Sequence, residues 1–343
     1  MLTMPDVESK PPRIVVTAPV SDALMDQYRA IAPGYRVDRF KDEVPNSVWG
    51  DAEVLFAGSL YPAPEQAPRL RWIQTMSAGF DGPLRRPVAQ LNDITLTSVS
   101  GIHATAIAEF CLGMMLALNL KIPAMLDLKR EKKWGRDDER FRPAPLRGQT
   151  VGIVGYGSIG RELARLCAAL GMTVLAAKRD AMKPEAGDVF TLHEGTGDPA
   201  GDIPARLYPG QAVTTMAREC DFLVVTVPLT DATRHTIDAR VFEAMKPTAY
   251  FINIARGSIA DEPALIAALQ AGDIAGAALD VFSAEPLPAD NLLWTLPNVI
   301  ISPHVSGGFP EYAEAAGKVF AENLRRYVER KPLLNVLDRT RGY

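Results

Sequence analysis

The sequence has few of the residues that mark several common protein classes. Only three cysteines occur in 343 residues, Cys111, Cys167 and Cys220, and they are widely spaced. An odd number at wide spacing argues against a disulfide framework and against a zinc cluster. We therefore expect buried thiols in a reducing compartment, a cytoplasmic location and no metal site.

An excess of charge of one sign is also absent. Lys and Arg number 37 and Asp and Glu number 41, which gives a formal net charge of −4. Such a chain has no general attraction for nucleic acid or for an anionic membrane. We expect neither as a partner, and an anionic substrate must be bound by local groups.

Long hydrophobic runs are missing as well. The most apolar stretch, Phe110 to Leu118, lies between Glu109 and Lys121 and is far shorter than the roughly 20 residues of a membrane-spanning helix. The first 13 residues lack the basic start and apolar core of a secretory signal. A helix from His103 to Asn119, apolar nearly all round, is instead expected in a core or at a subunit contact.

What is present is a regular alternation of strand and helix patterns. Short β-branched runs at 13–17, 53–57, 72–75 and 95–98 predict a first α/β unit with a mainly parallel sheet. A second series predicts six strands with crossover helices, which matches a doubly wound nucleotide-binding fold. Its strands are expected at 150–154, 173–177, 222–227, 249–253, 275–279 and 298–301.

Two further segments complete the expected organisation. A helical pattern from Pro310 to Arg330 is too short for its own domain, so we expect it to return to the first unit. The stretch from Asp180 to Gln211, rich in Gly, Pro and Asp, does not fit the alternation. Loops of this length are often functional or mobile, and a surface elaboration is equally open. The expected domains are residues 1–101 with 306–343, and residues 102–305.

A glycine-rich turn follows the first strand of the second series. Its G-x-G-x-x-G pattern lies between the strand 150–154 and a helix over 159–170. Glycines in this pattern allow a tight turn, close approach of a pyrophosphate and close helix–strand contact, and the first amides of the helix bind phosphate. In this context the pattern predicts a dinucleotide site. The residues concerned are Gly155, Tyr156, Gly157, Ser158, Ile159 and Gly160.

The end of the strand 173–177 bears on the choice between NAD and NADP. An NAD enzyme usually offers a carboxylate there to the adenosine 2′-hydroxyl. This sequence instead has Lys178 and Arg179, with Asp180 two places late. Because basic side chains pair with a 2′-phosphate, NADP is favoured over NAD. The alternative, that both side chains point into water, stays open.

Three residues just past later strands suggest a catalytic set. Arg256, Glu285 and His304 follow consecutive strands at the edge where open α/β sheets bind ligands. Arg256 offers a forked cation to a carboxylate and a polarised carbonyl. His304 suits the general acid that protonates the carbonyl oxygen as hydride arrives, and a neighbouring Glu285 would favour its protonated form. The combination indicates reduction of a 2-keto acid, while His103 and His235 are interpreted as structural.

These segments resemble the D-isomer-specific 2-hydroxyacid dehydrogenase family. The resemblance spans nearly the whole chain and is densest from Gly101 to His304, in stretches such as VGIVGYGSIGRELA and AALDVFSAEPLP. It implies an α/β fold of two Rossmann-like parallel-sheet domains, one flavodoxin-like and one doubly wound, with the active site in the cleft and usually a homodimer. The implied reaction is hydride transfer between NAD(P)H and a small 2-keto or D-2-hydroxy acid.

The resemblance also implies roles for individual residues. Arg256 would bind the substrate, Glu285 and His304 would form the acid–base pair, and Asp280 would contact the nicotinamide. The segment after Met76 resembles the family's substrate loop, in which Ser77 and the amides near Ala78 and Gly79 would hold the substrate carboxylate. Other expected dinucleotide contacts are Val227, Pro228, Thr233 (which also suits a helix start), Ile254, Ala255, Arg256 and His304.

Two other functions stay open from the sequence. Phosphite oxidation would use the same Arg, Glu and His set, whereas formate dehydrogenases resemble this family but carry Gln in place of Glu285. A dinucleotide-sensing binding protein without turnover would need a partner-binding surface, which the sequence does not reveal. The identity of the acid is unreadable, because one apolar contact discriminates by only about 1–3 kcal/mol.

Overall fold

The computed structural model describes residues 11–136, 138–141 and 143–343, and their contacts divide the chain into two compact units. Unit 1 joins the N-terminal segment, up to Ile102, with Pro310–Tyr343, and unit 2 is His103–Phe309. Each unit contains one parallel sheet, so the predicted α/β fold is confirmed. We expect no secretory signal at the start of the sequence. Its first 10 residues lie outside the described part of the chain.

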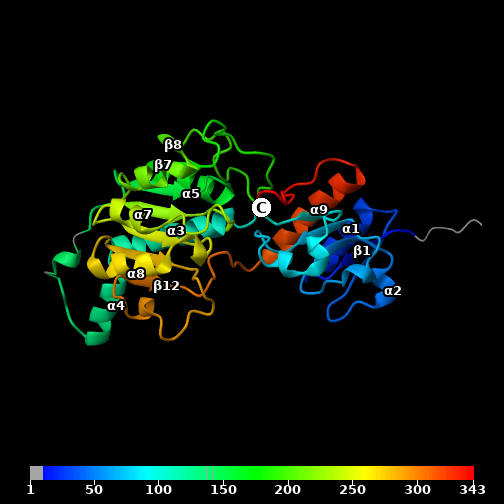
Figure 1. The fold of residues 1–343 in the computed structure, drawn as a ribbon, viewed down its shortest axis with the longest axis horizontal. Coiled ribbons are helices and arrows are strands. Elements are labelled where there is room, and N and C mark those ends of the chain that lie inside the picture. The colour runs from blue at the N-terminus through cyan, green and yellow to red at the C-terminus, as the bar shows by residue number, and fades with distance from the viewer. Residues whose placement is uncertain (1–10, 137, 142) are drawn as a thin grey trace, which may run out of the picture. The chain divides into compact units, whose positions relative to one another are not determined.

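Unit 1 contains a five-stranded sheet in the order β2-β1-β3-β4-β5, the flavodoxin-like arrangement. Figure 1 shows α9 beside α1 within this unit. Phe320 of α9 stacks on Phe56 with a ring-centroid distance of 4.6 Å and also contacts Tyr28 and Trp72. The elements are β1 (Arg13–Val16), α1 (Asp22–Ile31), β2 (Arg36–Arg39), α2 (Asn46–Trp49), β3 (Ala52–Ala57), β4 (Trp72–Thr75), β5 (Thr95–Thr97) and α9 (Tyr312–Val328).

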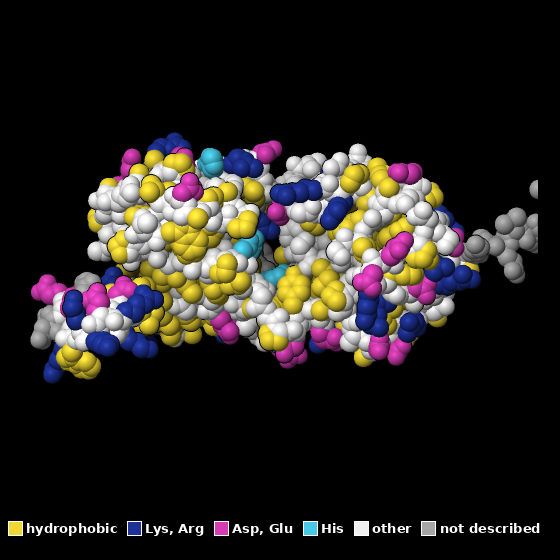
Figure 2. Space-filling view, turned by 90° about the horizontal axis from the view of Figure 1, so that it is seen from below, with side chains coloured by type: hydrophobic (Ala, Val, Ile, Leu, Met, Phe, Trp, Pro, Cys, Tyr) yellow, Lys and Arg dark blue, Asp and Glu magenta, His cyan; other side chains and the backbone are white. Residues whose placement is uncertain are grey.

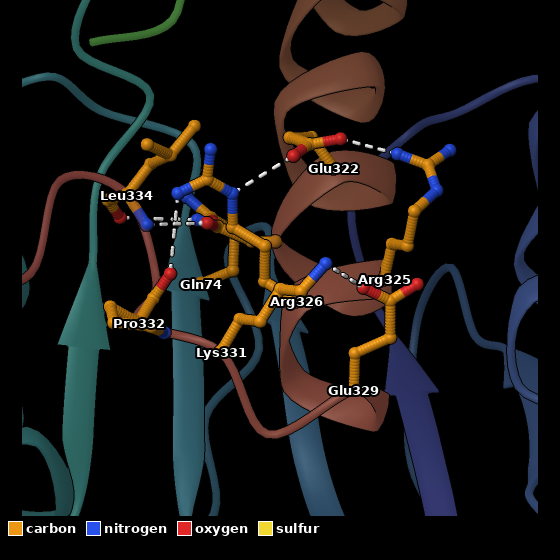
Figure 3. Close-up of polar contacts among 9 residues, drawn as sticks. Gln74, Glu322, Arg325, Arg326, Glu329, Lys331, Pro332 and Leu334 are labelled. Atoms are coloured by element: carbon orange, nitrogen blue, oxygen red, sulfur yellow. Dashed lines mark hydrogen bonds and ion pairs between the residues drawn. The ribbon is translucent and has the colours of Figure 1, made fainter. Parts of the chain in front are cut away.

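Buried amide side chains fasten the C-terminal segment to this sheet. Asn323 of α9 donates to Gln74 of β4 at 2.9 Å and accepts from the Leu334 amide at 2.7 Å. Arg326 bonds both Glu322 and the carbonyl of Pro332 (Figure 3). Because Gln74 and Asn323 have no exposed surface, these bonds satisfy polar groups that water does not reach. The segment after α9 is therefore part of unit 1.

Unit 2 contains a seven-stranded parallel sheet in the order β12-β11-β10-β9-β6-β7-β8, a doubly wound fold. Its inner strands are largely runs of buried residues, such as FLVV in β9. The elements are α3 (Ala104–Asn119), α4 (Ile122–Glu131), β6 (Thr150–Val154), α5 (Ser158–Ala169), β7 (Thr173–Lys178), β8 (Arg206–Pro209), α6 (Val213–Ala217), β9 (Phe222–Val225), α7 (Ala239–Ala244), β10 (Tyr250–Asn253), α8 (Glu262–Ala271), β11 (Gly276–Leu279) and β12 (Val299–Ile301).

Helix positions follow the signals in the sequence. Helix α8 begins where the Asp261 side chain accepts from the Ala264 amide, and it ends at Gly272, whose φ of 75° suits glycine. The apolar helix α3 packs against α5 and buries Ile107, Cys111 and Met115. The predictions of these helices and of α9 are confirmed.

Among the described helices, none is alone long and apolar enough to cross a membrane. Only α3 and α4 taken together reach that length and apolar character, and they are bent by 58° at the break between them.

Two strands were not predicted. β2 reads RVDR, whose charged residues hide the strand pattern, and β8 reads RLYP at the edge of its sheet. β8 pairs in parallel with β7, with Lys178 opposite Pro209. The residues between β7 and β8 form no helix, so the regular crossover expected in a doubly wound fold is replaced by an irregular connection.

Candidate active site

Unit 2 brings the predicted loops to one edge of its sheet. β12, β11, β10, β9 and β6 are successive neighbours and all run parallel. The loops that follow these strands therefore lie at the same edge, which is where such sheets bind ligands. Arg256, Glu285, His304 and the glycine loop belong to these loops.

The glycine loop fits a dinucleotide pyrophosphate. Gly155 has a φ of 108°, and a Cβ there would lie 2.8 Å from the Val227 side chain. A Cβ on Gly160 would lie 2.1 Å from the Gly155 carbonyl oxygen, whereas one on Gly157 would meet nothing within 4 Å. The first and third glycines are thus required by packing, and the second leaves backbone open to a ligand at the start of α5.

The loop after β9 is fastened to the glycine loop. Thr226 donates through its hydroxyl to the Gly155 carbonyl at 2.7 Å. The Thr233 hydroxyl donates to the Pro228 carbonyl at 2.7 Å and accepts from the Thr230 amide. Thr233 therefore closes the turn that begins at Pro228, and the Thr226 contact is one that sequence reasoning did not identify.

Lys178 is the last residue of β7, and its ammonium contacts the irregular connection that follows. It donates to the carbonyls of Lys183 and Glu185, the latter at 3.2 Å. Burial and the charge of Arg161 lower the pKa of Lys178. Arg179 follows with an exposed side chain. Lys178 therefore does not simply point into water.

The loop that carries Arg256 is shaped by a buried amide. Asn253 accepts from the Ala255 amide at 3.1 Å and donates to the Arg256 carbonyl at 3.0 Å. A Cβ on Gly257 would lie 1.9 Å from the carbonyl carbon of Phe282. The loops after β10 and β11 thus touch backbone to backbone, and only glycine allows this approach.

Glu285 and His304 form a direct pair. The Nδ1 of His304 lies 2.7 Å from Oε2 of Glu285, and the other carboxylate oxygen accepts from the Phe282 amide at 3.0 Å. Both side chains remain partly exposed, at 45% for His304 and 36% for Glu285. Because the carboxylate holds Nδ1, Nε2 is the nitrogen left for a substrate oxygen.

Asp280 shapes the loop that carries His304. It is fully buried and accepts from the Ser302 hydroxyl at 2.7 Å and from the amides of Val305 and Ser306, each at 2.9 Å. Its own carbonyl accepts from the His304 amide. This holds His304 at a φ of 54°, a conformation uncommon for histidine. The contact of Asp280 with a nicotinamide stays a prediction.

His103, interpreted from sequence as structural, lies near Arg256. It is buried, and burial together with the charge of Arg256 lowers its pKa to about 4. A Cβ on Gly307 would lie 3.1 Å from its ring. His103 is therefore neutral at neutral pH and borders the candidate site. No spacing signal connects it with Arg256 in the sequence.

The predicted substrate loop lies in unit 1, directly after β4. Ser77 donates through its hydroxyl to the Gly79 carbonyl at 2.7 Å, and its own carbonyl accepts from Thr75 and from the Val99 amide. Tyr312 of α9 donates to the Met76 carbonyl. The loop is therefore a tight turn fixed by its own bonds and by α9.

In the part of the chain that the structure describes, no group of three or more His, Cys, Asp or Glu side chains is arranged to hold a metal ion. Cys111, Cys167 and Cys220 are buried and unbridged.

Comparison with known proteins places these features in one family. Residues 112–306 match the NAD-binding domain of the D-isomer-specific 2-hydroxyacid dehydrogenases. A glyoxylate reductase of Thermococcus gammatolerans is 34% identical over 265 residues, which cover 76% of this chain and 74% of the relative. A glyoxylate reductase of Thermofilum pendens is 34% identical over 276 residues, 80% and 74% of the two chains.

Solved structures are similar over nearly the whole chain. A D-isomer-specific 2-hydroxyacid dehydrogenase from Xanthobacter autotrophicus, in complex with NADPH, superposes with a TM-score of 0.78 at 27% identity and covers 97% of this chain and 99% of its own. An NADPH-dependent glyoxylate/hydroxypyruvate reductase from Sinorhizobium meliloti, in complex with NADP, gives a TM-score of 0.74 at 26% identity over 97% and 100% of the two chains.

Proposed function

This chain belongs to the D-isomer-specific 2-hydroxyacid dehydrogenase family, and we propose that it reduces small 2-keto acids such as glyoxylate and hydroxypyruvate with NADPH. Membership makes it an NAD(P)-dependent oxidoreductase that moves a hydride between a nicotinamide and a 2-keto or 2-hydroxy acid. The observation that carries the proposal is the 2.7 Å pair of Glu285 and His304, at the same sheet edge as the glycine loop.

The chemical roles follow from the groups at this edge. When bound, the reduced nicotinamide supplies the hydride that adds to the keto carbon. His304 donates a proton through Nε2 to the keto oxygen, and Glu285 stabilises the positive charge of the imidazolium before transfer. Arg256 binds the substrate carboxylate and polarises the carbonyl through its forked donors. The assignment of the carboxylate to the amides near Ala78 and Gly79 of unit 1 rests on the resemblance to the family's substrate loop.

The dinucleotide is assigned to the loops after β6, β7, β9, β10, β11 and β12. The open backbone at Gly157 and the first amides of α5 bind the pyrophosphate. Asp280 accepts from the nicotinamide carboxamide. The remaining proposed contacts are Gly155, Tyr156, Ser158, Ile159, Gly160, Lys178, Arg179, Val227, Pro228, Thr233, Ile254, Ala255, Arg256 and His304.

Preference for NADP rests on charge at the end of β7. Lys178 and Arg179 stand where a carboxylate would bind the 2′-hydroxyl of NAD. A 2′-phosphate pairs with such cations and is repelled by a carboxylate. The relatives from Xanthobacter and Sinorhizobium, which were solved with NADPH and NADP, give further support.

A cytoplasmic homodimer is also part of the proposal. Figure 2 shows hydrophobic side chains on the surface of unit 2 beside the charged lobe that carries α4. Exposed apolar patches of this kind mark protein contacts, and a symmetric pair of copies is the commonest way to cover one. Sedimentation velocity tests the dimer, and a monomer at micromolar concentration would contradict it. The exposed side chains are Leu116, Leu120, Ile122, Met125 and Leu126.

The experiment that tests the function is oxidation of NADPH and NADH with glyoxylate, hydroxypyruvate and pyruvate, followed by the absorbance of reduced nicotinamide. We expect turnover with at least one acid and a kcat/KM for NADPH about tenfold above that for NADH, since one charge-assisted pair is worth about 1.4 kcal/mol or more. Dinucleotide binding without turnover on any of these acids would overturn the substrate assignment. Preference for NADH would overturn the cofactor assignment alone.

A further inference from the structure

Residues 180–205, which we name the insert, connect β7 to β8 without a helix. In Figure 1 they form the green loops beside β7, β8 and α5. The insert is ordered by specific polar contacts. The amide of Ala205 donates to the Val174 carbonyl near the start of β7, and the side-chain anchors belong to the glycine loop, to the N-terminal part of α5 and to the end of β7.

The first anchor is a buried carboxylate. Asp198 is 4% exposed and accepts from the Tyr156 hydroxyl at 2.5 Å. It also accepts from the amides of Gly201, Asp202 and Ile203 at 3.0 to 3.3 Å. Burial raises the pKa of Asp198, but these bonds outweigh burial and its pKa lies below the usual value. Asp198 therefore ties the insert to Tyr156, the second residue of the glycine pattern.

The second anchor is the guanidinium of Arg161 in α5. It lies 4.6 Å from the centre of the Tyr156 ring and donates to the backbone carbonyls of Asp198 and Pro184. The neighbouring Glu162 accepts from the Gly197 amide at 2.6 Å. Two separate parts of the insert, near residues 184 and 198, are thus held by consecutive residues of the helix that carries the pyrophosphate-binding amides.

The third contact connects the insert with the proposed ribose-phosphate site. The Lys178 ammonium donates to the carbonyls of Lys183 and Glu185, on either side of Pro184. An ammonium has three N–H donors, so one donor remains for a ligand. Because Arg161 fixes Pro184, the position of the Lys178 ammonium depends on the same buried cluster that fixes the glycine loop.

We propose that the insert is a positioning element for cofactor selectivity: the Asp198–Tyr156–Arg161 cluster fixes residues 183–185, and these hold the Lys178 ammonium toward a 2′-phosphate. The inference rests on the proposed preference for NADP. It assigns a function to a segment that the catalytic pair does not require. An insert that served only to stabilise unit 2 would affect both dinucleotides equally.

The test compares binding of NADPH and NADH in the absence of keto acid, by the fluorescence of the reduced nicotinamide. Asp198→Asn removes acceptor capacity from the cluster, and Tyr156→Phe removes one hydroxyl while keeping the ring beneath Arg161. We expect the Kd for NADPH to rise about tenfold and that for NADH by less than about threefold, because only a charged phosphate uses the positioned ammonium. Glu194→Gln, an exposed change in the same insert, is the matched control and leaves both constants unchanged.

A double-mutant cycle with Lys178→Met identifies the route. If Asp198 acts through Lys178, the double variant loses no more NADPH selectivity than Lys178→Met alone. The inference would be overturned if the variants bound both dinucleotides equally more weakly, or if the selectivity ratio stayed unchanged in Tyr156→Phe and Asp198→Asn. It would also be overturned if the losses of selectivity were additive in the double variant. A wild-type protein without NADPH preference would instead overturn the cofactor proposal on which it rests, so the two failures are distinguishable.

Discussion

Two loops of unit 2 are each organised by a buried aspartate. Asp280 accepts from amides at 305 and 306 and shapes the loop after β12, while Asp198 accepts from amides at 201 to 203 and shapes the insert. Asp280 directly follows β11, the strand beside β12. Asp198 lies in an irregular connection and reaches Tyr156, 42 residues away.

The comparison teaches that one physical device serves two purposes. A carboxylate with several backbone donors converts a flexible segment into a defined one, because an unpaired buried charge would be costly. At Asp280 the segment so defined carries the proposed acid, His304. At Asp198 it carries no reacting group but holds the Lys178 ammonium, so its effect should appear in binding.

The largest expected effect is on kcat and follows from replacing His304, in the loop that Asp280 shapes. His304→Ala should lower kcat for keto acid reduction by about 10³-fold, since a positioned general acid contributes about 10²–10⁴. Steady-state kinetics measures this, and the Kd for NADPH should rise by less than about threefold, because His304 is one of many proposed dinucleotide contacts. Loss of dinucleotide binding as well would show that His304 is structural and would remove the contrast with the insert.

Replacement of Arg256 should have the next largest effect. Arg256→Ala should reduce kcat/KM for the keto acid by about 10²-fold, because a charge-assisted forked pair to the carboxylate is lost. Arg256→Lys keeps the charge but loses the fork and should recover only part of the activity. Unchanged kinetics in Arg256→Ala would refute its role at this edge.

The pH dependence of the free energy of unfolding tests whether His103, near Arg256, is buried and neutral. The pKa of His103 is lowered to about 4 in the folded protein, against about 6.5 when unfolded. The unfolded state therefore binds more protons as pH falls from about 6.5 to 4, and folding is weakened by up to about 3 kcal/mol in that window. Urea unfolding at pH 7.5 and 4.5 measures this. Between these two pH values the free energy of unfolding should fall less in His103→Asn than in wild type. An equal loss in both would contradict the buried, neutral state.

The smallest expected effect comes from Asp280→Asn, the same substitution as in the Asp198→Asn test but at the other aspartate. Asp280→Asn weakens the loop after β12 and should lower kcat about tenfold, because one or two bonds to a charged acceptor are lost or weakened. The ratio of the Kd values for NADPH and NADH should stay as in wild type. A changed ratio would mean that Asp280 also affects the choice between NADPH and NADH, so that the two aspartates do not have separate roles.

The sequence predicted that the loops with the candidate catalytic residues meet at one edge of the sheet, because the signals for this arrangement are local. The glycine pattern, Arg256 and His304 each follow a strand within a few residues, and parallel neighbours carry their loops to one edge. Strand and helix periodicity also predicted the two sheets, apart from β2 and β8, whose charged or edge residues hide the pattern.

What could not be predicted depends on contacts between distant residues. The bond of Asp198 to Tyr156 crosses an irregular segment without periodicity, and the proximity of His103 to Arg256 joins the start of α3 with the end of β10. Asn253 acts through backbone groups of its own loop, which is visible only once the turn is formed. No spacing rule encodes such pairings.

The division of unit 1 into two chain segments has a consequence for synthesis on the ribosome. Strands β1 to β5 emerge first, but Phe320, which covers Phe56 and Trp72, follows only after the roughly 200 residues of unit 2. At about 5–20 residues per second this is a delay of about 10–40 s. During that interval Phe56 and Trp72 lack the helix that covers them, so the burial of this aromatic face has to wait for the C-terminal segment.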